Sequence, residues 1–332
     1  MATVEASRSL PTAEPDTLGY GRQVIATEAA ALQALQETLD GNFVAAVGLL
    51  LGLRGRVITT GIGKSGYVAR KAAATFASTG TPALFVHPAE AAHGDLGMLM
   101  PHDALIAFSN SGNTTELQPV LNHAAKLGIK VIGVAGRADS LVMRSADVQL
   151  LLPRVDEACP ENLAPTTSTV MMMALGDALA MTVARAQGLS RAGFEALHPG
   201  GTIGKRLMRV AALMHRSAAL PLVSANAPMT DVIVTMTSRS FGIAGVVDDG
   251  GALRGVITDG DLRRHLHRIT ESTAADVMTR QPVWVSPGCF VEDALEVLNR
   301  NKITAMFVLD DADGHRPVGL LHVHDFLRLG LA

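Results

Sequence analysis

The chain has 332 residues, of which 48% are hydrophobic and 18% charged, and this length and composition predict two folded domains with buried cores. Its net charge of −3, without any Lys/Arg cluster interleaved with aromatic residues, argues against nucleic acid as a partner. The two cysteines, Cys159 and Cys289, lie far apart, which argues against a disulfide framework or a structural zinc and favours a reducing cytoplasm. No apolar run reaches the roughly 20 residues that a membrane span requires, so we expect no membrane partner.

The first part of the chain alternates helical and strand patterns. A small, polar, proline-containing stretch over 1–18 predicts a disordered leader, and apolar residues at helical spacing predict one or two helices between 19 and 52. Strands that are separated by helices pair in parallel and are covered on both faces. We therefore predict an α/β domain over 19–205 with a five-stranded, doubly wound parallel sheet. Its strands are expected at 56–60, 83–87, 104–108, 130–134 and 148–152.

A long apolar helix is predicted after the last of these strands. Residues 165–187 are hydrophobic on nearly every side of a helix, which indicates a buried position. Asp177 lies within this segment. It is either a functional carboxylate or one that is satisfied by local hydrogen bonds or by a solvent-facing edge of the helix.

The C-terminal part of the chain contains an internal repeat. Met214 pairs with Met278 and Asp261 with Asp325, both pairs 64 residues apart. Each copy predicts the order strand, helix, strand, turn, strand, helix, and two copies together bury a face that one would leave exposed. We therefore expect a tandem α+β domain with repeats over 206–269 and 270–332.

A glycine-rich turn, GIGKSG, follows the first strand and leads into a helix. N–H groups at a helix N-terminus lack partners and bind anions. The spacing fits a dinucleotide turn, but the second strand ends in ALFVHP without an acid for the ribose, and a P-loop would need glycine where Ile58 stands. The turn therefore predicts an anion site of another kind, with Lys64 inside it.

A second polar turn, SNSGNTTE over 109–116, follows the third strand and again opens a helix. Its serine and threonine hydroxyls surround a glycine that frees backbone N–H groups, a combination that suits one compact phosphate group. Both turns lie at carboxyl ends of strands near the switch point of the sheet, where α/β proteins bind ligands. Together they predict a sugar-phosphate site.

Further reactive side chains occur in the loops HPAEAAHGDLG, DEACPENLAPTTST and ALHPGGTIGK. The rival to acid–base chemistry is a metal-assisted hydride shift, since His87, His93, Asp95 and His102 lie close in sequence, but their spacing fits no familiar metal site. We therefore expect that no metal is required. The candidates for a single pocket are Lys64, His93, Glu116, Glu157 and His198.

These motifs, in this order and followed by the repeat, are similar to those of the arabinose-5-phosphate isomerases, which combine a sugar isomerase (SIS) domain with two cystathionine-β-synthase-type (CBS) repeats. The resemblance implies reversible interconversion of D-arabinose 5-phosphate and D-ribulose 5-phosphate without an organic cofactor, for synthesis of 3-deoxy-D-manno-octulosonate (Kdo). It implies Lys64, Glu116, Glu157 and His198 as the essential polar set. The residues expected to bind the substrate are Gly63, Ser65, His93, Ser109, Ser111, Thr114, Thr115 and Thr166.

The chemistry assigns roles to this set. Moving a carbonyl between adjacent carbons proceeds through an enediol and requires a base that removes a proton from carbon. We expect Glu157 in this role, with Glu116 as the alternative. His198 opens the ring of the cyclic sugar and shuttles protons between oxygens, because both of its protonation states are accessible near neutral pH. Lys64 stabilises the developing enediolate charge.

The repeats carry one further expectation. Thr258 and Asp261 in VITDGD resemble the phosphate- and ribose-contacting pair of nucleotide-binding CBS repeats; in the second copy Asp325 remains, but His322 replaces the threonine. The repeats either bind a nucleotide or nucleotide sugar or serve only as scaffold and dimer interface. We also expect a homo-oligomer, a tetramer, in which a neighbouring subunit completes the pocket. The alternative to an enzyme is a non-catalytic sugar-phosphate sensor that signals through the repeats.

Overall fold

The computed structural model describes residues 16–198, 200–216, 219–310 and 315–331. It divides into two compact units, and the boundary in the sequence falls between Leu197 and His198. The expected leader lies outside the described residues up to position 15, and α1 (Thr17–Glu37) begins immediately after its cap, Asp16.

The first unit contains the predicted five-stranded parallel sheet, and its strand order is β2-β1-β3-β4-β5. Val57 of β1 pairs with Ala83 of β2 on one side and with Ala104 of β3 on the other. The strands after β1 are therefore added first on one side of it and then on the other. This is the switch point that the sequence predicted. The strands are β1 (Val57–Thr60), β2 (Ala83–Val86), β3 (Ala104–Phe108), β4 (Lys130–Ala135) and β5 (Val148–Leu151).

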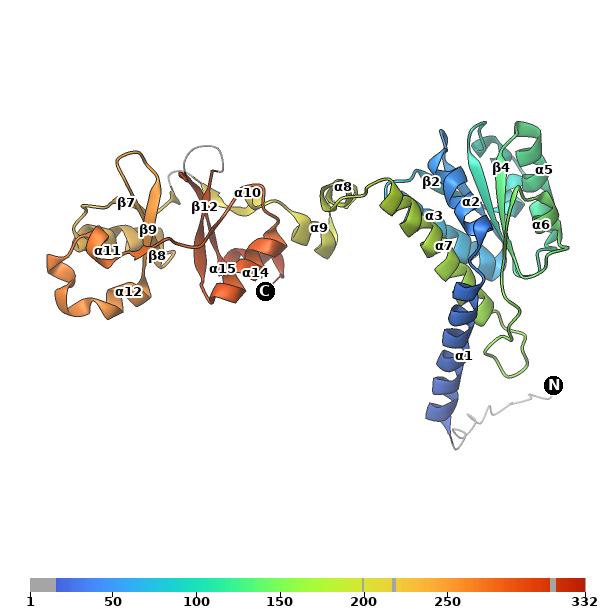
Figure 1. Ribbon diagram of the computed structural model, residues 1–332, viewed down its shortest axis with the longest axis horizontal. Coiled ribbons are helices and arrows are strands. Elements are labelled where there is room, and N and C mark those ends of the chain that lie inside the picture. The colour runs from blue at the N-terminus through green and yellow to red at the C-terminus, as the bar shows by residue number, and fades with distance from the viewer. Residues whose placement is uncertain (1–15, 199, 217–218, 311–314, 332) are drawn as a thin grey trace, which may run out of the picture. The chain divides into compact units, whose positions relative to one another are not determined.

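Helices cover both faces of the sheet (Figure 1). On β3, Ile106 and Phe108 pack into one core and Leu105 and Ala107 into the other, as the two-residue period of a strand requires. The first core is closed by α1, α2 (Gly41–Leu51), α3 (Gly63–Ser78) and α7 (Thr167–Ala186). The second is closed by α4 (Pro88–Ala91), α5 (Gln118–Leu127) and α6 (Leu141–Ser145), and the unit ends with α8 (Arg191–Leu197). The doubly wound prediction is confirmed.

The helix α7 lies at the centre of the first core. Its length and composition alone would allow it to cross a membrane, but it packs against α1, α2 and α3, with Met172 and Leu179 fully buried. Asp177 forms an ion pair with Lys71 of α3, and both side chains are about two-fifths exposed. Asp177 therefore joins two helices at the rim of the core.

The helices α3 and α7 run in the same direction. Lys71 contacts Asp177 and Thr81 donates to Gln187, so the offset between contacting residues is 106 at both points (177 − 71 and 187 − 81). A constant offset means that the helices are parallel and that their N-termini lie at the same end. The turn before α3 and the loop before α7 are thereby brought to one edge of the sheet.

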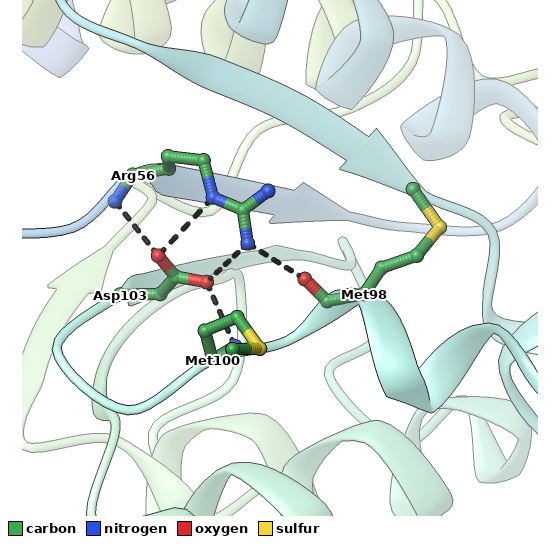
Figure 2. A network of polar contacts seen from close by, with 4 residues as sticks. All are labelled: Arg56, Met98, Met100 and Asp103. Carbon is green, nitrogen blue, oxygen red and sulfur yellow. Dashed lines mark hydrogen bonds and ion pairs between the residues drawn. The ribbon is translucent and has the colours of Figure 1, made fainter.

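A polar network ties together the opposite edge, where the strands begin (Figure 2). Asp103 precedes β3, and its side chain is only 2% exposed. Its carboxylate accepts from the Arg56 guanidinium at 3.0 Å and from the backbone N–H groups of Arg56 and Met100 at 2.8 and 2.9 Å. Burial raises the pKa of Asp103, but these hydrogen bonds and the guanidinium charge outweigh burial and hold it below its usual value.

The second unit contains two four-stranded sheets, one for each predicted repeat. Their orders are β10-β9-β8-β7 and β11-β12-β13-β6, so each repeat contributes its first short strand to the sheet of the other. The strands are β6 (His215–Arg216), β7 (Leu222–Ser224), β8 (Ile243–Val247), β9 (Leu253–Thr258), β10 (Thr279–Arg280), β11 (Trp284–Val285), β12 (Ala305–Leu309) and β13 (Pro317–His322). The helices are α9 (Gly201–Leu207), α10 (Val210–Leu213), α11 (Met229–Arg239), α12 (Asp259–Arg264), α13 (Ala274–Val277), α14 (Val291–Asn301) and α15 (Val323–Leu329).

The aligned methionines of the repeat explain this exchange of strands. A Cβ atom at Gly319 would lie 2.4 Å from Sδ of Met214, and one at Gly255 would lie 2.7 Å from Sδ of Met278. Each methionine therefore packs on a glycine of the other repeat's sheet, where any larger residue would collide with it.

The helix α9 belongs to the second unit, whereas the sequence placed it in the first domain. It packs on α14, and Lys205 Nζ donates to the carbonyl oxygen of Leu329 at 3.0 Å. Both partners lie far from α9 in the sequence, Leu329 being 124 residues after Lys205, so the local pattern of HPGGTIGK could not indicate these contacts.

Candidate active site

The glycine-rich turn brings the N-terminus of α3 close to the ends of β1 and β3. A Cβ at Gly61 would lie 2.8 Å from the Ser65 carbonyl oxygen, and one at Gly66 would lie 2.8 Å from that of Gly61. Gly63 has φ +58°, in the left-handed region that favours glycine. Lys64 follows and is exposed. A cation in the first turn of a helix opposes the helix dipole, so this position strengthens a positive field at some expense in stability.

The serine-rich loop begins at the end of β3. Ser109 is buried, its Oγ accepts from the N–H of Gly112 at 3.1 Å, and it is 2.9 Å from Thr114 Oγ1. Gly112 has φ +67°, and a Cβ there would lie 2.1 Å from Ser140 Oγ. The loop is thus held in one conformation, with Ser111 exposed on it.

The loop does not lead directly into a helix, because the 3-10 turn η2 (Thr115–Leu117) precedes α5. Glu116 lies on this turn and is exposed. Its Oε2 accepts a hydrogen bond from Thr115 Oγ1 at 3.2 Å. Glu116 therefore lies on the same short segment as the proposed phosphate-binding hydroxyls.

The carboxylate of Glu157 caps the N-terminus of α7. Oε2 accepts from the N–H of Thr166 at 2.8 Å, from the N–H of Ser168 at 3.1 Å and from Thr166 Oγ1 at 3.3 Å, and Oε1 accepts from Ser168 Oγ. Burial raises the pKa of Glu157, but the hydrogen bonds from Ser168 and Thr166 outweigh it and leave the pKa below its ordinary value. The half-buried carboxylate is therefore ionised at neutral pH.

The loop that carries Glu157 is itself anchored. Asn162 has φ +53°, its Oδ1 accepts from the N–H of Glu157 at 2.6 Å, and its Nδ2 donates to Asp156 Oδ1 at 2.9 Å. Asn162 and Ser168 were not singled out from the sequence. The signal that could have found them is the density of polar side chains in PENLAPTTST just before an apolar helix, which is typical of a capped N-terminus.

The segment after β2 carries the histidines and acids of the metal hypothesis. His87 caps α4, since its Nδ1 accepts from the N–H of Ala89 at 3.2 Å, and His93 is exposed just beyond that helix. Across the described parts of the chain, no three His, Cys, Asp or Glu side chains are grouped so that they could hold a metal ion.

The structure brings the candidates of the first unit to one edge of the sheet. Lys64 follows β1, His93 follows β2, Glu116 follows β3 and Glu157 follows β5, and the strands are parallel. Because α3 and α7 are parallel, Lys64 and the carboxylate of Glu157 are held at two helix N-termini at the same end. His198 is half-buried and begins the second unit, so its role in this pocket stays a prediction.

A cleft of about 940 Å³ lies between the two repeats and is lined by residues of both. Asp261 is buried in it, where its carboxylate accepts from Thr258 Oγ1 at 2.7 Å, from Arg264 Nη2 at 2.6 Å and from Thr279 Oγ1 at 3.2 Å. A ribose hydroxyl that bound Asp261 would replace one of these donors. Burial raises the pKa of Asp261, but the hydrogen bonds from Thr258 and Arg264 outweigh burial, so the pKa lies below its ordinary value.

The second half of the cleft has a different chemistry. Asp325 accepts from the N–H of His322 at 2.8 Å and lies 3.0 Å from Nε2 of His215. Burial lowers the pKa of His322, and the neighbouring His324 lowers it further, while Asp325 opposes both. Imidazoles thus replace the hydroxyl groups of the first half.

Comparison with known proteins extends this picture. The family model of the SIS domain matches residues 51–182, and that of the CBS domain matches 210–268 and 274–332. The chain is 42% identical over 320 residues to the arabinose 5-phosphate isomerase KdsD of Pseudomonas aeruginosa, covering 95% of this chain and 98% of that protein. It is 41% identical over 315 residues to KdsD of Escherichia coli K12, covering 94% and 95%.

The chain belongs to the arabinose 5-phosphate isomerase family. Solved structures resemble its first unit. One is an Escherichia coli protein in complex with arabinose 5-phosphate, 36% identical, with a TM-score of 0.55 over 57% of this chain and all of that one. Another is a phosphosugar isomerase from Bacteroides fragilis, described as involved in capsule formation, 34% identical, with a TM-score of 0.53 over 55% and 97% of the two chains. Membership of the arabinose 5-phosphate isomerase family thus spans nearly the whole chain and includes both units.

Proposed function

We propose that this chain interconverts D-arabinose 5-phosphate and D-ribulose 5-phosphate and so supplies Kdo synthesis for lipopolysaccharide or capsule. The observation that carries the proposal is the ionised, half-buried carboxylate of Glu157 at the edge of the sheet that also carries Lys64 and the serine-rich loop. A carboxylate, a cation and a phosphate-binding loop are the groups that isomerisation of a phosphorylated sugar requires. The curated relatives bear the name of this activity.

The phosphate is bound by the serine-rich loop and the turn before α3. A dianionic phosphate placed there accepts hydrogen bonds from backbone N–H groups and from hydroxyl groups. Each hydrogen bond to such a charged acceptor contributes roughly 1.5–3 kcal/mol. The groups assigned to the substrate are Gly63, Ser65, His93, Ser109, Ser111, Thr114, Thr115 and Thr166. Fixing the phosphate orients the sugar so that its carbonyl end lies toward Glu157 and Lys64.

The reaction is a proton transfer between adjacent carbons. Glu157 removes the proton from C2 of the open-chain aldose, the C–H electron pair forms the enediolate double bond, and the carbonyl oxygen takes the negative charge. Lys64 stabilises that charge, and His198 opens the ring and moves the proton between the two oxygens. Return of the proton from Glu157 to C1 gives the ketose. Glu116 is the alternative base, and no metal or organic cofactor enters the scheme.

The working assembly in this proposal is a cytoplasmic homotetramer. A neighbouring subunit completes each pocket by supplying its His198. The CBS cleft takes a nucleotide or nucleotide sugar at Thr258 and Asp261, with Asp325 at the corresponding position of the second repeat.

The direct test is incubation of the purified protein with D-ribulose 5-phosphate in deuterated water. The proposal expects D-arabinose 5-phosphate and deuterium at the carbon that exchanges its proton, both measured by NMR. Binding of the ketose with neither product nor deuterium uptake would leave the sugar-phosphate sensor as the function. A chelator is the control for the metal-assisted route, and activity should be unchanged by it.

A further inference from the structure

The two oxygens of the Glu157 carboxylate are held unequally. Oε2 accepts three hydrogen bonds, from Thr166 N, Ser168 N and Thr166 Oγ1, whereas Oε1 accepts one, from Ser168 Oγ. Each carboxylate oxygen offers about two lone-pair sites. Oε2 is therefore saturated, and Oε1 retains one site for an incoming proton.

All four donors are neutral, and among the described residues no cation contacts this carboxylate. Two of the four come from Ser168, which is buried in the first turn of α7, the core helix of the unit. Since α7 is fixed by its packing, Ser168 is a rigid support that reaches both carboxylate oxygens at once.

We propose that Ser168 is the positioning residue of the proton-transferring carboxylate and that Oε1 of Glu157 is the atom that takes the proton. This inference rests on the proposed isomerase function and deepens it. In this proposal Ser168 acts on Glu157 and not on the sugar. Its N–H group holds Oε2, and its hydroxyl group holds Oε1 and so fixes the rotation of the carboxylate. The free lone pair of Oε1 is thereby held in one orientation.

The hydroxyl of Ser168 also remains bonded through the reaction. It donates to Oε1 while Glu157 is ionised, and an O–H group can rotate when Oε1 becomes protonated. In that step the substrate C2–H bond breaks, an O–H bond forms at Oε1, and the electron pair enters the enediolate. The proton then returns from Oε1 to C1, so Glu157 ends as it began.

The test compares the pH dependence of kcat/KM in the full-length wild type, Ser168→Ala and Ser168→Thr. In Ser168→Ala one of the hydrogen bonds that lower the pKa of Glu157 is lost, while burial still raises that pKa. The pKa of Glu157 therefore rises, and the acidic limb of the profile moves to higher pH. We expect kcat at neutral pH to fall about ten-fold, because the free lone pair of Oε1 is no longer held in one orientation, with KM little changed. Ser168→Thr keeps the hydroxyl and should keep the wild-type limb.

The matched control is Thr169→Ala. Thr169 Oγ1 donates to the Thr166 carbonyl oxygen at 2.7 Å in the same helical turn and does not contact Glu157, so its loss should leave the acidic limb in place. An unshifted limb in a folded, active Ser168→Ala variant would overturn the inference and leave the isomerase function standing. Absence of turnover in the wild type would instead overturn the proposed function itself.

Discussion

The two edges of the first unit's sheet each hold a buried or half-buried carboxylate, and they hold it in different ways. At the edge where the strands begin, Asp103 is paired with the Arg56 guanidinium, which neutralises its charge within 3.0 Å. At the edge where the strands end, Glu157 receives only neutral donors. Hydrogen bonds outweigh burial and lower the pKa of both groups.

The difference separates a structural carboxylate from a reactive one. A carboxylate whose charge is neutralised by a fixed cation interacts weakly with any further group. A carboxylate that is stabilised only by neutral donors keeps its negative field, and Glu157 also keeps a free lone pair. Lys64 lies at the same end of the unit, in the first turn of the neighbouring helix α3. The comparison predicts that substitutions at the two edges will change different properties: turnover at the edge where the strands end, stability at the edge where they begin.

The largest effect is expected from Lys64→Met. Removing a group that stabilises charge in the transition state lowers kcat by about 10²–10³-fold. Stability should be unchanged or higher, because the cation opposes the dipole of α3, an effect of about 0.3–1 kcal/mol. Steady-state kinetics and thermal unfolding measure the two quantities. A variant with wild-type kcat would remove Lys64 from the proposed mechanism.

Asp103→Asn should show the reverse pattern. It leaves the Arg56 guanidinium without a charged partner and weakens two backbone hydrogen bonds, so we expect a loss of about 2–4 kcal/mol in the free energy of unfolding. Urea denaturation measures this loss. The folded fraction should retain wild-type kcat, and a large fall in kcat without destabilisation would show that the edge at which the strands begin is not merely structural.

The pH dependence of stability sharpens the comparison. Because the folded pKa of Asp103 lies below its usual 3.8, its contribution is complete above that value and is lost as the pH falls through the lowered pKa. The free energy of unfolding of the wild type should therefore fall more steeply below about pH 4 than that of Asp103→Asn. Parallel curves for the two proteins would contradict the role of the Arg56–Asp103 pair.

The smallest effect is expected from Asp177→Asn. The ion pair with Lys71 is exposed, and such pairs contribute about 0–1 kcal/mol. We expect a change in the free energy of unfolding within that range and an unaltered kcat, by the same two assays. A loss of turnover would give Asp177 the functional role that the sequence left open.

The sequence predicts the sheet well, because each strand of the first unit is a short apolar run bounded by turn residues, and β1 and β4 begin and end within one residue of the expected positions. The repeat predicts three strands and two helices for each copy, but not the fourth strand of each sheet, because β10 and β6 come from the other copy and their pairing joins distant parts of the chain. The position of α9 was missed because its partner Leu329 lies near the C-terminus.

The site is predictable as a set of residues but not as an arrangement. The motifs identify Lys64, Glu116 and Glu157 from their positions after strands. The two hydrogen bonds from Ser168 to Glu157 join residues that are eleven positions apart across a loop, and no periodic sequence pattern indicates such a contact. The parallel packing of α3 and α7, which brings Lys64 and Glu157 to one end, is likewise a tertiary property.

The most direct test of the central claim is the rate of deuterium exchange into bound D-ribulose 5-phosphate in Glu157→Gln, with Glu116→Gln measured alongside. Glutamine retains the size of the side chain and one acceptor oxygen but cannot take the proton. The account predicts that Glu157→Gln binds the ketose and loses exchange by about 10²–10⁴-fold, while Glu116→Gln still exchanges. Wild-type exchange in Glu157→Gln, with exchange abolished in Glu116→Gln, would contradict it.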